Sequence, residues 1–267
     1  MHEHLAEEPR YRVSVVIPAR NEARNLPHVL EALPAGLHEV IVVDGHSTDG
    51  TIEVAQRARP DVKIVQQTRH GKGNALACGF AELTGDMVVM LDADGSADPA
   101  EIPASVAALA DGTDFAKGTR FVRGGQSHDI TRFRRIGNAA LNRLVNLLFG
   151  TCYTDLCYGY NAFRVRILPV LELPPVQAEA PGGMLRGDGF EIETLITVRA
   201  ARAAVRITEV ASTERARLHG ASNLRAIPDG IRVLRTILAE RRRLAKLGRR
   251  LVTDQTITDR DLIRETT

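Results

Sequence analysis

The sequence predicts an α/β fold in which a doubly wound, mainly parallel sheet is flanked by helices. Short apolar runs that read as buried strands alternate with segments whose apolar residues recur at helical spacing. Such alternation is typical of parallel strands joined by right-handed helical connections. Polar and glycine residues follow the runs, as expected where ligands bind at the carboxyl edge of a parallel sheet. The runs are Val13–Ile17, Val40–Val43, Val62–Val65 and Met87–Leu91.

The length and composition are those of a globular protein with a large core. The chain has 267 residues, 44% hydrophobic and 25% charged, and its net charge of +2 is too small to indicate nucleic acid as the main partner. Cys78, Cys152 and Cys157 form no disulfide framework, so we interpret them as packing residues in a reducing compartment. The N-terminus lacks the apolar core of a signal peptide, and no stretch approaches the ~20 apolar residues that span a bilayer. We expect cytoplasmic localisation, either free or peripheral at the inner face of the membrane.

The loops after the first three strands carry polar side chains suited to a nucleotide. Asp44, which ends the second strand, can accept hydrogen bonds from a ribose or base. Lys72, between Gly71 and Gly73, offers a cation to phosphate where glycines let backbone amides approach a ligand. Ordinary turns favour the same residue types, so each loop alone leaves both interpretations open. The glycine-rich loops of ATPases and dinucleotide enzymes do not occur in the sequence.

The fourth strand ends in Asp92-Ala93-Asp94, followed by Gly95 and Ser96. Residues two apart in an extended segment project to the same side, so the two carboxylates can converge on one point. Hard oxygen ligands suit Mg²⁺ or Mn²⁺, above all a metal also held by substrate phosphates. The alternative is a plain turn at Asp94-Gly95, with Asp98 capping the next helix.

These segments together carry a family resemblance. The chain resembles the family 2 glycosyltransferases of the GT-A fold, and within them the dolichol-phosphate and polyprenyl-phosphate mannosyltransferase-like branch. The resemblance covers roughly Arg12 to Arg235, and relatives often have a second Asp where Gly45 stands. It rests on four motifs, Val16–Glu22, Val42–Thr51, Gly71–Gly73 and Leu91–Asp94.

The resemblance implies roles for individual residues in an inverting enzyme. Asp92 and Asp94 would hold the metal that neutralises charge on the leaving diphosphate. Arg217 and Ser222 would belong to a flexible loop closing over the diphosphate, with His219 as a further metal ligand to consider. The nucleotide-binding residues would be Pro18, Ala19, Arg20, Glu22, Asp44, Lys72 and Asp92.

The second half of the domain is expected to bind the acceptor. The resemblance places Arg120 and Arg135 near an acceptor phosphate, although relatives often have a Ser where Asn138 is the nearest polar residue. Segment 128–149 begins with basic residues and continues with an apolar face, which suits either a lipid phosphate or a core-facing helix. Asp188 is the candidate general base for a hydroxyl acceptor, and Asp155 would lie at the acceptor side. Alternatively, the carboxylates near Asp188 only place negative charge at the N-terminus of the following helix, which is a common use of acidic residues.

The expected domain organisation has four parts. A polar tail spans residues 1–11, and the GT-A domain spans 12–227, divided into a nucleotide-binding half (12–98) and an acceptor half (99–227). A basic amphipathic helix follows at 228–252, then a polar tail at 253–267. The basic helix fits either an anionic membrane surface or a homodimer contact.

The sequence leaves three functions to compare. The leading one is a metal-dependent inverting glycosyltransferase that moves a sugar from a UDP- or GDP-sugar to polyprenyl phosphate. The second keeps the donor but uses a soluble acceptor, such as phosphoglycerate or a natural-product hydroxyl. The third, from another class, is a non-catalytic nucleotide-sugar-binding protein, which the presence of Asp92, Asp94, Asp188 and Arg217 argues against.

Overall fold

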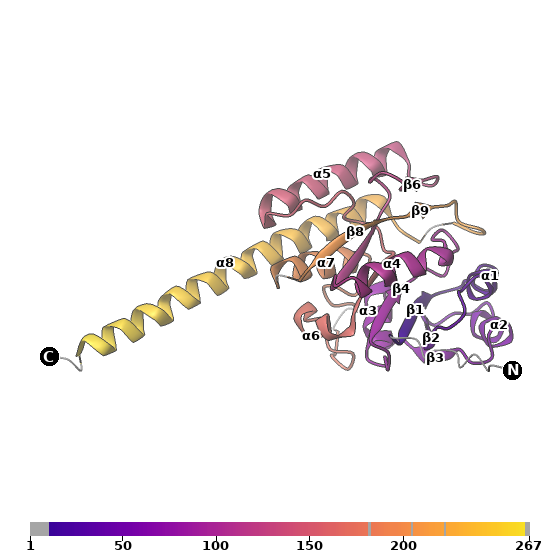
Figure 1. The fold of residues 1–267 in the computed structure, drawn as a ribbon, viewed down its shortest axis with the longest axis horizontal. Helices are drawn as coiled ribbons and strands as arrows, with labels where there is room; N and C mark the ends of the chain where they lie inside the picture. Colours follow the sequence, from indigo (N-terminus) through magenta and orange to yellow (C-terminus); the bar gives the residue numbers. More distant parts are fainter. Residues whose placement is uncertain (1–10, 181–182, 204, 222, 265–267) are drawn as a thin grey trace, which may run out of the picture.

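The first four strands along the chain form a parallel half of the sheet, as the sequence predicts. The computed structural model describes residues 11–264, except 181, 182, 204 and 222. Strands β3, β2, β1 and β4 pair in parallel in that order. Helices connect them along the chain (Figure 1). The elements are β1 (Val13–Ala19), α1 (Leu26–Glu31), β2 (Glu39–Asp44), α2 (Thr51–Ala58), β3 (Lys63–Gln66), α3 (Lys72–Phe80) and β4 (Met87–Met90).

The strands from the second half of the chain extend the same sheet, and one of them runs antiparallel to its neighbours. Strand β7 is antiparallel to both β4 and β5, and β8 then pairs in parallel with β5. This gives the seven-stranded order β3-β2-β1-β4-β7-β5-β8, beside a separate β6-β9 pair. The elements are η1 (Pro99–Glu101), α4 (Ile102–Ala110), β5 (Phe115–Thr119), β6 (Gln126–Ser127), α5 (Arg132–Phe149), β7 (Asn161–Arg164), η2 (Val165–Ile167), α6 (Leu168–Leu171), α7 (Ile192–Arg202), β8 (Ile207–Ala211), β9 (Thr213–Glu214) and α8 (Ala226–Arg264).

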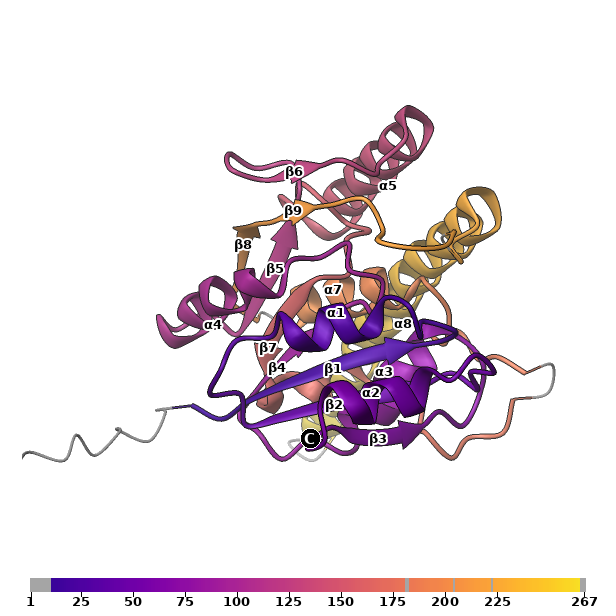
Figure 2. The ribbon, with the colours of Figure 1, turned by 90° about the vertical axis from the view of Figure 1, so that its right-hand side faces the viewer.

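Alternating side chains of the strands build two cores, one on each face of the sheet. Val15 and Ile17 pack with residues of α1, α2 and α4, whereas Val16, between them, packs with α3, α6 and α7. This alternation follows from the period of two in a strand. Figure 2 shows the helices on both sides of the sheet. The doubly wound, mainly parallel fold expected from the sequence is confirmed.

Helices α5 and α8 lie outside this sandwich, against α7. They share a third core that includes Val145, Val198 and Ile237. Thr131 caps the start of α5 by accepting a hydrogen bond from the Arg134 amide, and Gly150 ends it with a φ of 66°. Helix α8 runs to Arg264, so its backbone continues through most of the segment 253–267 that the sequence suggested as a polar tail (Figure 1).

Candidate active site

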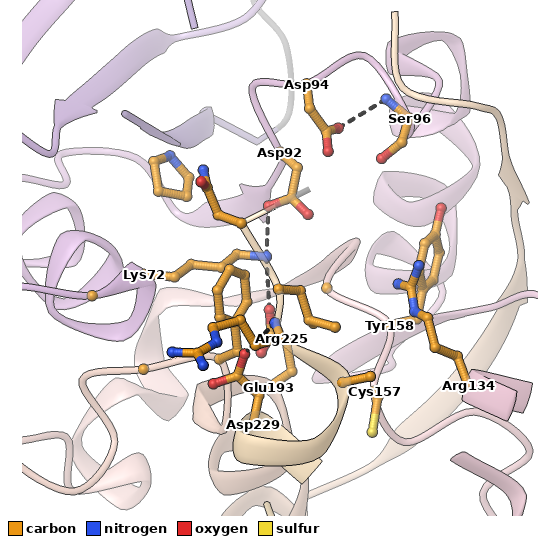
Figure 3. A pocket seen from close by; sticks show the side chains of 18 of the residues that line it. Lys72, Asp92, Asp94, Ser96, Arg134, Cys157, Tyr158, Glu193, Arg225 and Asp229 are labelled. Carbon is orange, nitrogen blue, oxygen red and sulfur yellow. Dashed lines mark hydrogen bonds and ion pairs between the residues drawn. The ribbon is translucent and has the colours of Figure 1, made fainter. Parts of the chain in front are cut away.

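A cavity of about 950 Å³ opens at the carboxyl ends of the parallel strands. Pro18 and Ala19 from β1, Gly45 after β2 and Asp92 after β4 line it, as the topology predicts. Arg20, Glu22, Lys72, Asp94 and Arg217 also line it, so the structure brings together most of the residues predicted for the donor, together with Arg120, which was predicted for the acceptor. Figure 3 shows Asp92 and Asp94 on one wall with Lys72 beneath them.

The two aspartates each pair with a cation. Lys72 Nζ lies 2.6 Å from Asp92 Oδ1, and Arg217 Nη1 lies 3.2 Å from Asp94 Oδ2. The other Asp94 oxygen accepts a hydrogen bond from the Ser96 amide at 2.9 Å. The Asp94 carboxylate is therefore held by both its turn and the Arg217 loop.

Lys72 bridges two carboxylates at the base of the cavity. Its Nζ lies 2.7 Å from Glu193 Oε1 on α7, as well as next to Asp92. Burial would lower the pKa of Lys72, but the charges of Asp92 and Glu193 raise it well above its ordinary value. A side chain at Gly159 would collide with this pair, because its Cβ would lie 2.8 Å from Lys72 Nζ and 2.9 Å from Glu193 Oε1. Lys72 therefore stays charged in a tight space.

The loop that opens α3 is packed against the backbone before α7. The Gly73 amide donates to the Asp188 carbonyl at 2.6 Å, and a Cβ on Gly73 would lie 1.8 Å from the Gly187 oxygen. Only glycine fits this approach. The contact fixes the start of α3, and with it the position of Lys72.

Glu22 and Arg217 join the first loop of the domain to the loop after β9. They form an ion pair, and Asn25 Nδ2 donates to the second Glu22 oxygen at 2.6 Å. Burial raises the pKa of Glu22, an effect that Asn25 and Arg217 partly offset. The predicted loop residue Arg217 thus lies over the donor end of the cavity. Ser222 lies outside the described residues.

The donor set fits a divalent metal that also binds substrate. Asp92 and Asp94 supply carboxylate oxygens, which suit Mg²⁺ or Mn²⁺. Among the described residues no group of three or more His, Cys, Asp or Glu side chains could hold a metal. A metal here would therefore take further oxygens from a diphosphate or water. His219 does not line the cavity, and its Nδ1 lies 3.4 Å from the Arg24 guanidinium.

Neither candidate catalytic carboxylate reaches the cavity wall. Asp188 is 1% exposed and forms a two-point ion pair with Arg69 at 2.8 and 2.9 Å. Asp155 is 0% exposed and forms a similar pair with Arg120. A general base must reach the proton that it removes, so this geometry does not favour the base role expected for Asp188.

The expected acceptor residues also differ in their surroundings. Arg120 lines the cavity, but Asp155 and Glu214 occupy its guanidinium. Burial would lower the pKa of Arg120, and these two carboxylates raise it overall. Arg135 is exposed, stacks on Phe121 at 5.5 Å and does not line the cavity, whereas Arg134 does.

Asp44 also lies behind the wall rather than in it. It is 2% exposed and accepts hydrogen bonds from the Ser47 amide and from Gln66 Nε2. Its neighbour Gly45 forms the lining instead. A Cβ at Gly45 would lie 2.9 Å from the Arg20 Cβ, so a side chain at this position would require Arg20 to shift.

The structure adds residues that sequence reasoning did not assign to the site. Glu193, Tyr158, Arg225 and Arg232 line the cavity, and Figure 3 shows Glu193, Tyr158 and Arg225 around it. Glu193 comes from the first turn of α7, where an acidic residue usually signals only a helix start. Arg225 directly precedes α8, and Arg232 lies near its start, within the segment 228–252 that the sequence presents as a basic helix.

The comparisons with known proteins agree with this geometry. The family described as "Glycosyl transferase family 2" matches residues 14–169, more than half of the chain. The glycosyltransferase AglJ of Haloferax volcanii is 33% identical over 224 residues, covering 82% of this chain and 68% of the relative. An undecaprenyl-phosphate mannosyltransferase of Micrococcus luteus is 33% identical over 211 residues, with coverage of 76% and 83%.

Other relatives match over a shorter part or by fold alone. A dolichol-phosphate mannosyltransferase of Pyrococcus furiosus is 32% identical over 180 residues, but the match spans 62% of this chain and 49% of that protein. The structure of glucosyl-3-phosphoglycerate synthase from Mycobacterium tuberculosis, solved with Mn²⁺, UDP-glucose and phosphoglyceric acid, has a TM-score of 0.67. It is 23% identical and covers 87% of this chain and 80% of its own, which shows a shared GT-A fold. The family match and the relatives that share most of their length with it show that this chain belongs to glycosyl transferase family 2, in the branch of the polyprenyl-phosphate sugar transferases.

Proposed function

We propose that the chain is a metal-dependent inverting glycosyltransferase that moves a sugar from a UDP- or GDP-sugar to a polyprenyl phosphate. The observation that carries the proposal is one continuous cavity. It joins Asp92 and Asp94 at one end to Arg134 on α5 and Arg225 beside α8. Outside this cavity, α5 and α8 expose apolar side chains.

The donor end has the groups that a nucleotide diphosphate needs. Asp92 and Asp94 would hold Mg²⁺ or Mn²⁺, which would neutralise the charge that develops on the leaving diphosphate. Arg217 lies beside these aspartates, and its Nη1, which contacts Asp94, would become available to a phosphate oxygen once a metal takes that carboxylate. Pro18, Ala19 and Glu22 form the adjacent wall against which the nucleoside would lie.

The acceptor end suits a phosphate anion better than a hydroxyl. A phosphate monoester is already a nucleophilic anion, so it needs no strong base. The predicted base Asp188 and the other predicted catalytic carboxylate, Asp155, are both held in buried ion pairs. In the described part of the chain, the Arg134 guanidinium forms one ion pair, with the half-exposed Asp129 at 3.2 Å, and so keeps donor groups for a phosphate. We propose Arg134 in place of Arg135 for this contact, with Arg120 and Asp155 as positioning residues.

The mouth of the cavity suits a lipid-bearing acceptor. Helix α5 packs along α8 (Figure 1). We name the exposed large apolar side chains of these two helices the α5/α8 apolar surface. The same two helices also expose arginines, and apolar side chains together with basic ones favour an anionic membrane surface. The exposed arginines include Arg132, Arg135 and Arg143 on α5 and Arg232 and Arg235 on α8. No helix in the described part of the chain is long and apolar enough to cross a bilayer. The surface comprises Phe133 (64% exposed), Ile136 (71%), Leu147 (80%), Ile227 (64%), Ile231 (44%), Leu234 (37%) and Leu238 (40%).

A transfer assay tests the proposal. Purified protein would be incubated with UDP- or GDP-sugars, Mg²⁺ or Mn²⁺, and a short polyprenyl phosphate, and the glycolipid measured by mass spectrometry. We expect metal-dependent glycolipid formation, reduced at least about a hundredfold in Asp92→Asn. Asp61→Asn is the matched control, because Asp61 is an exposed ion-pair partner of Arg59.

The outcomes separate the alternatives. Donor consumption with phosphoglycerate but not with lipid would replace the acceptor and keep the donor chemistry. Full activity of Asp92→Asn with an intact fold would overturn the metal assignment. Nucleotide-sugar binding without transfer to any acceptor would favour a binding protein instead.

A further inference from the structure

Each aspartate of the proposed metal site pairs with a basic side chain that also pairs with a buried glutamate. On one side, Lys72 lies between Asp92 Oδ1 at 2.6 Å and Glu193 Oε1 at 2.7 Å. The three residues come from three elements, the loop after β4, the start of α3 and the first turn of α7. Figure 3 shows the ammonium between the two carboxylates.

The second aspartate repeats the arrangement with different residues. Arg217 pairs with Asp94 through Nη1 and with Glu22 through Nη2. Asn25 donates to the other Glu22 oxygen and also to the His219 carbonyl, so it links the loop before α1 to the loop that carries Arg217.

Within each set the glutamate is the more deeply buried carboxylate. The side chains of Glu193 and Glu22 are 5% and 7% exposed, against 35% and 21% for Asp92 and Asp94. All four carboxylates line the cavity, but in each set the aspartate is the more exposed one. A metal that enters the cavity therefore has better access to the aspartates than to the glutamates.

This order matters because a metal and a protein cation compete for the same carboxylates. If Asp92 were the sole partner of Lys72, metal binding at Asp92 would leave a nearly buried ammonium without a counter-ion, which is strongly unfavourable. A second carboxylate on the same cation removes that cost. Lys72 can then lose its contact with Asp92 to the metal and still be paired with Glu193.

We infer that Glu193 and Glu22 are positioning residues that retain Lys72 and Arg217 beside the metal site when a divalent cation takes Asp92 and Asp94. The inference rests on the metal dependence in the proposed function. It assigns a role to Glu193 that is separate from contact with the sugar or the acceptor. The retained cations would stay close enough to meet the diphosphate that arrives with the metal.

Mn²⁺ binding tests the inference without an activity assay. Free Mn²⁺ would be titrated by electron paramagnetic resonance in the presence of UDP or GDP, using wild type, Glu193→Gln and Glu193→Asp. We expect both variants to raise the Mn²⁺ dissociation constant about tenfold. Glu193→Asp keeps the charge but is one methylene shorter, so it distinguishes loss of the contact to Lys72 from loss of a negative charge near the metal.

Glu82→Gln is the matched control, because Glu82 forms an exposed ion pair with Lys63 at 2.7 Å outside the cavity. It should bind Mn²⁺ as wild type does. In transfer assays, the defect of Glu193→Asp should be restored by saturating Mn²⁺, with kcat near that of wild type, whereas a merely structural defect would not respond to metal. Thermal melting would verify that the variants are folded.

Two results would overturn the inference, and they are distinguishable. Wild-type Mn²⁺ affinity in Glu193→Asp would remove the positioning role while leaving the proposed function intact. Absence of Mn²⁺ binding by wild type with either nucleotide would remove the metal dependence and this inference together.

Discussion

Arg120 and Asp155 form a buried two-point ion pair in the interior of the domain. Arg120 Nε lies 2.7 Å from Asp155 Oδ2, and Nη2 lies 2.9 Å from Oδ1. Sequence reasoning predicts both residues for the site, one for the acceptor phosphate and one for catalysis. The structure instead makes them partners, with Glu214 and Asn138 completing the network. This network supports the wall of the cavity.

Asp155→Asn should therefore act mainly on stability. Removing one charge of a buried ion pair leaves the other uncompensated, so the free energy of unfolding should fall by about 3 kcal/mol. Urea denaturation measures this, and Asp61→Asn, at an exposed pair, should cost no more than about 0.5 kcal/mol. Unchanged stability together with lost transfer would instead indicate direct contact with substrate.

The parallel half of the fold could be predicted because its signals are local. Three of the four strands from Val13 to Leu91 are largely apolar, the third along the chain is interrupted by Lys63, and polar residues follow each of them. The topology then gathers the loops after these strands at one edge. The antiparallel strand β7 gives no such signal, since Asn161–Arg164 is short and ends in polar residues. The residues from 253 to Arg264 are mostly polar, but they contain neither Pro nor Gly to end a helix.

Ion-pair partners far apart in the chain could not be predicted from the sequence. Arg69 and Asp188 lie 119 positions apart, and Lys72 meets Glu193 only after α3 and α7 pack on the same face of the sheet. A motif identifies a residue type at a loop, but it does not say whether the side chain faces the cavity or the core. This is why Asp92 and Asp94 line the cavity as predicted while Asp188 does not.

Glu240 should make the free energy of unfolding of this chain depend on pH. Burial alone would raise its pKa, but Arg199, at 2.9 Å, together with Arg202 and Arg243, lowers it below the ordinary value of 4.5. A carboxyl with a depressed pKa in the folded chain stabilises it above the unfolded pKa, and this contribution disappears as the pH falls through the folded value. The difference in unfolding free energy between wild type and Glu240→Gln should thus be constant near neutrality and shrink below pH 4.5.

Urea denaturation of wild type and Glu240→Gln between pH 3 and pH 7 measures how the difference in their unfolding free energies changes with pH. Glu39→Gln is less suitable as a control, because the pKa of Glu39 is also lowered, through hydrogen bonds from Ser14 and Thr84 that outweigh its burial. Glu82→Gln serves better as an exposed pair. A difference that grows on acidification would contradict the assignment.

The α5/α8 apolar surface should bind anionic lipid. Ile136→Ser and Leu147→Ser remove exposed apolar contacts on α5, where each large side chain contributes about 1.5–3 kcal/mol if fully buried in the bilayer interface. The double variant should therefore lose most of its cosedimentation with phosphatidylglycerol vesicles. Val170→Ser, at a 41% exposed residue of α6, is the control and should sediment like wild type. A double variant that sediments unchanged, or that shifts a dimer to a monomer, would assign the surface to another use.

Thiol reactivity reports on the acceptor side of the cavity. Cys157 lines the cavity, but burial, together with the charges of Asp155 and Glu193, raises the pKa of its thiol to about 12. Because the thiolate is the reactive form, Cys157 should react slowly with Ellman's reagent near pH 8, and the exposed Cys152 should react fast. Cys152→Ser should abolish the fast phase and Cys157→Ser should leave it unchanged. A fast phase that persists in Cys152→Ser would mean that Cys157 is open to solvent and that the Asp155 network does not close this wall.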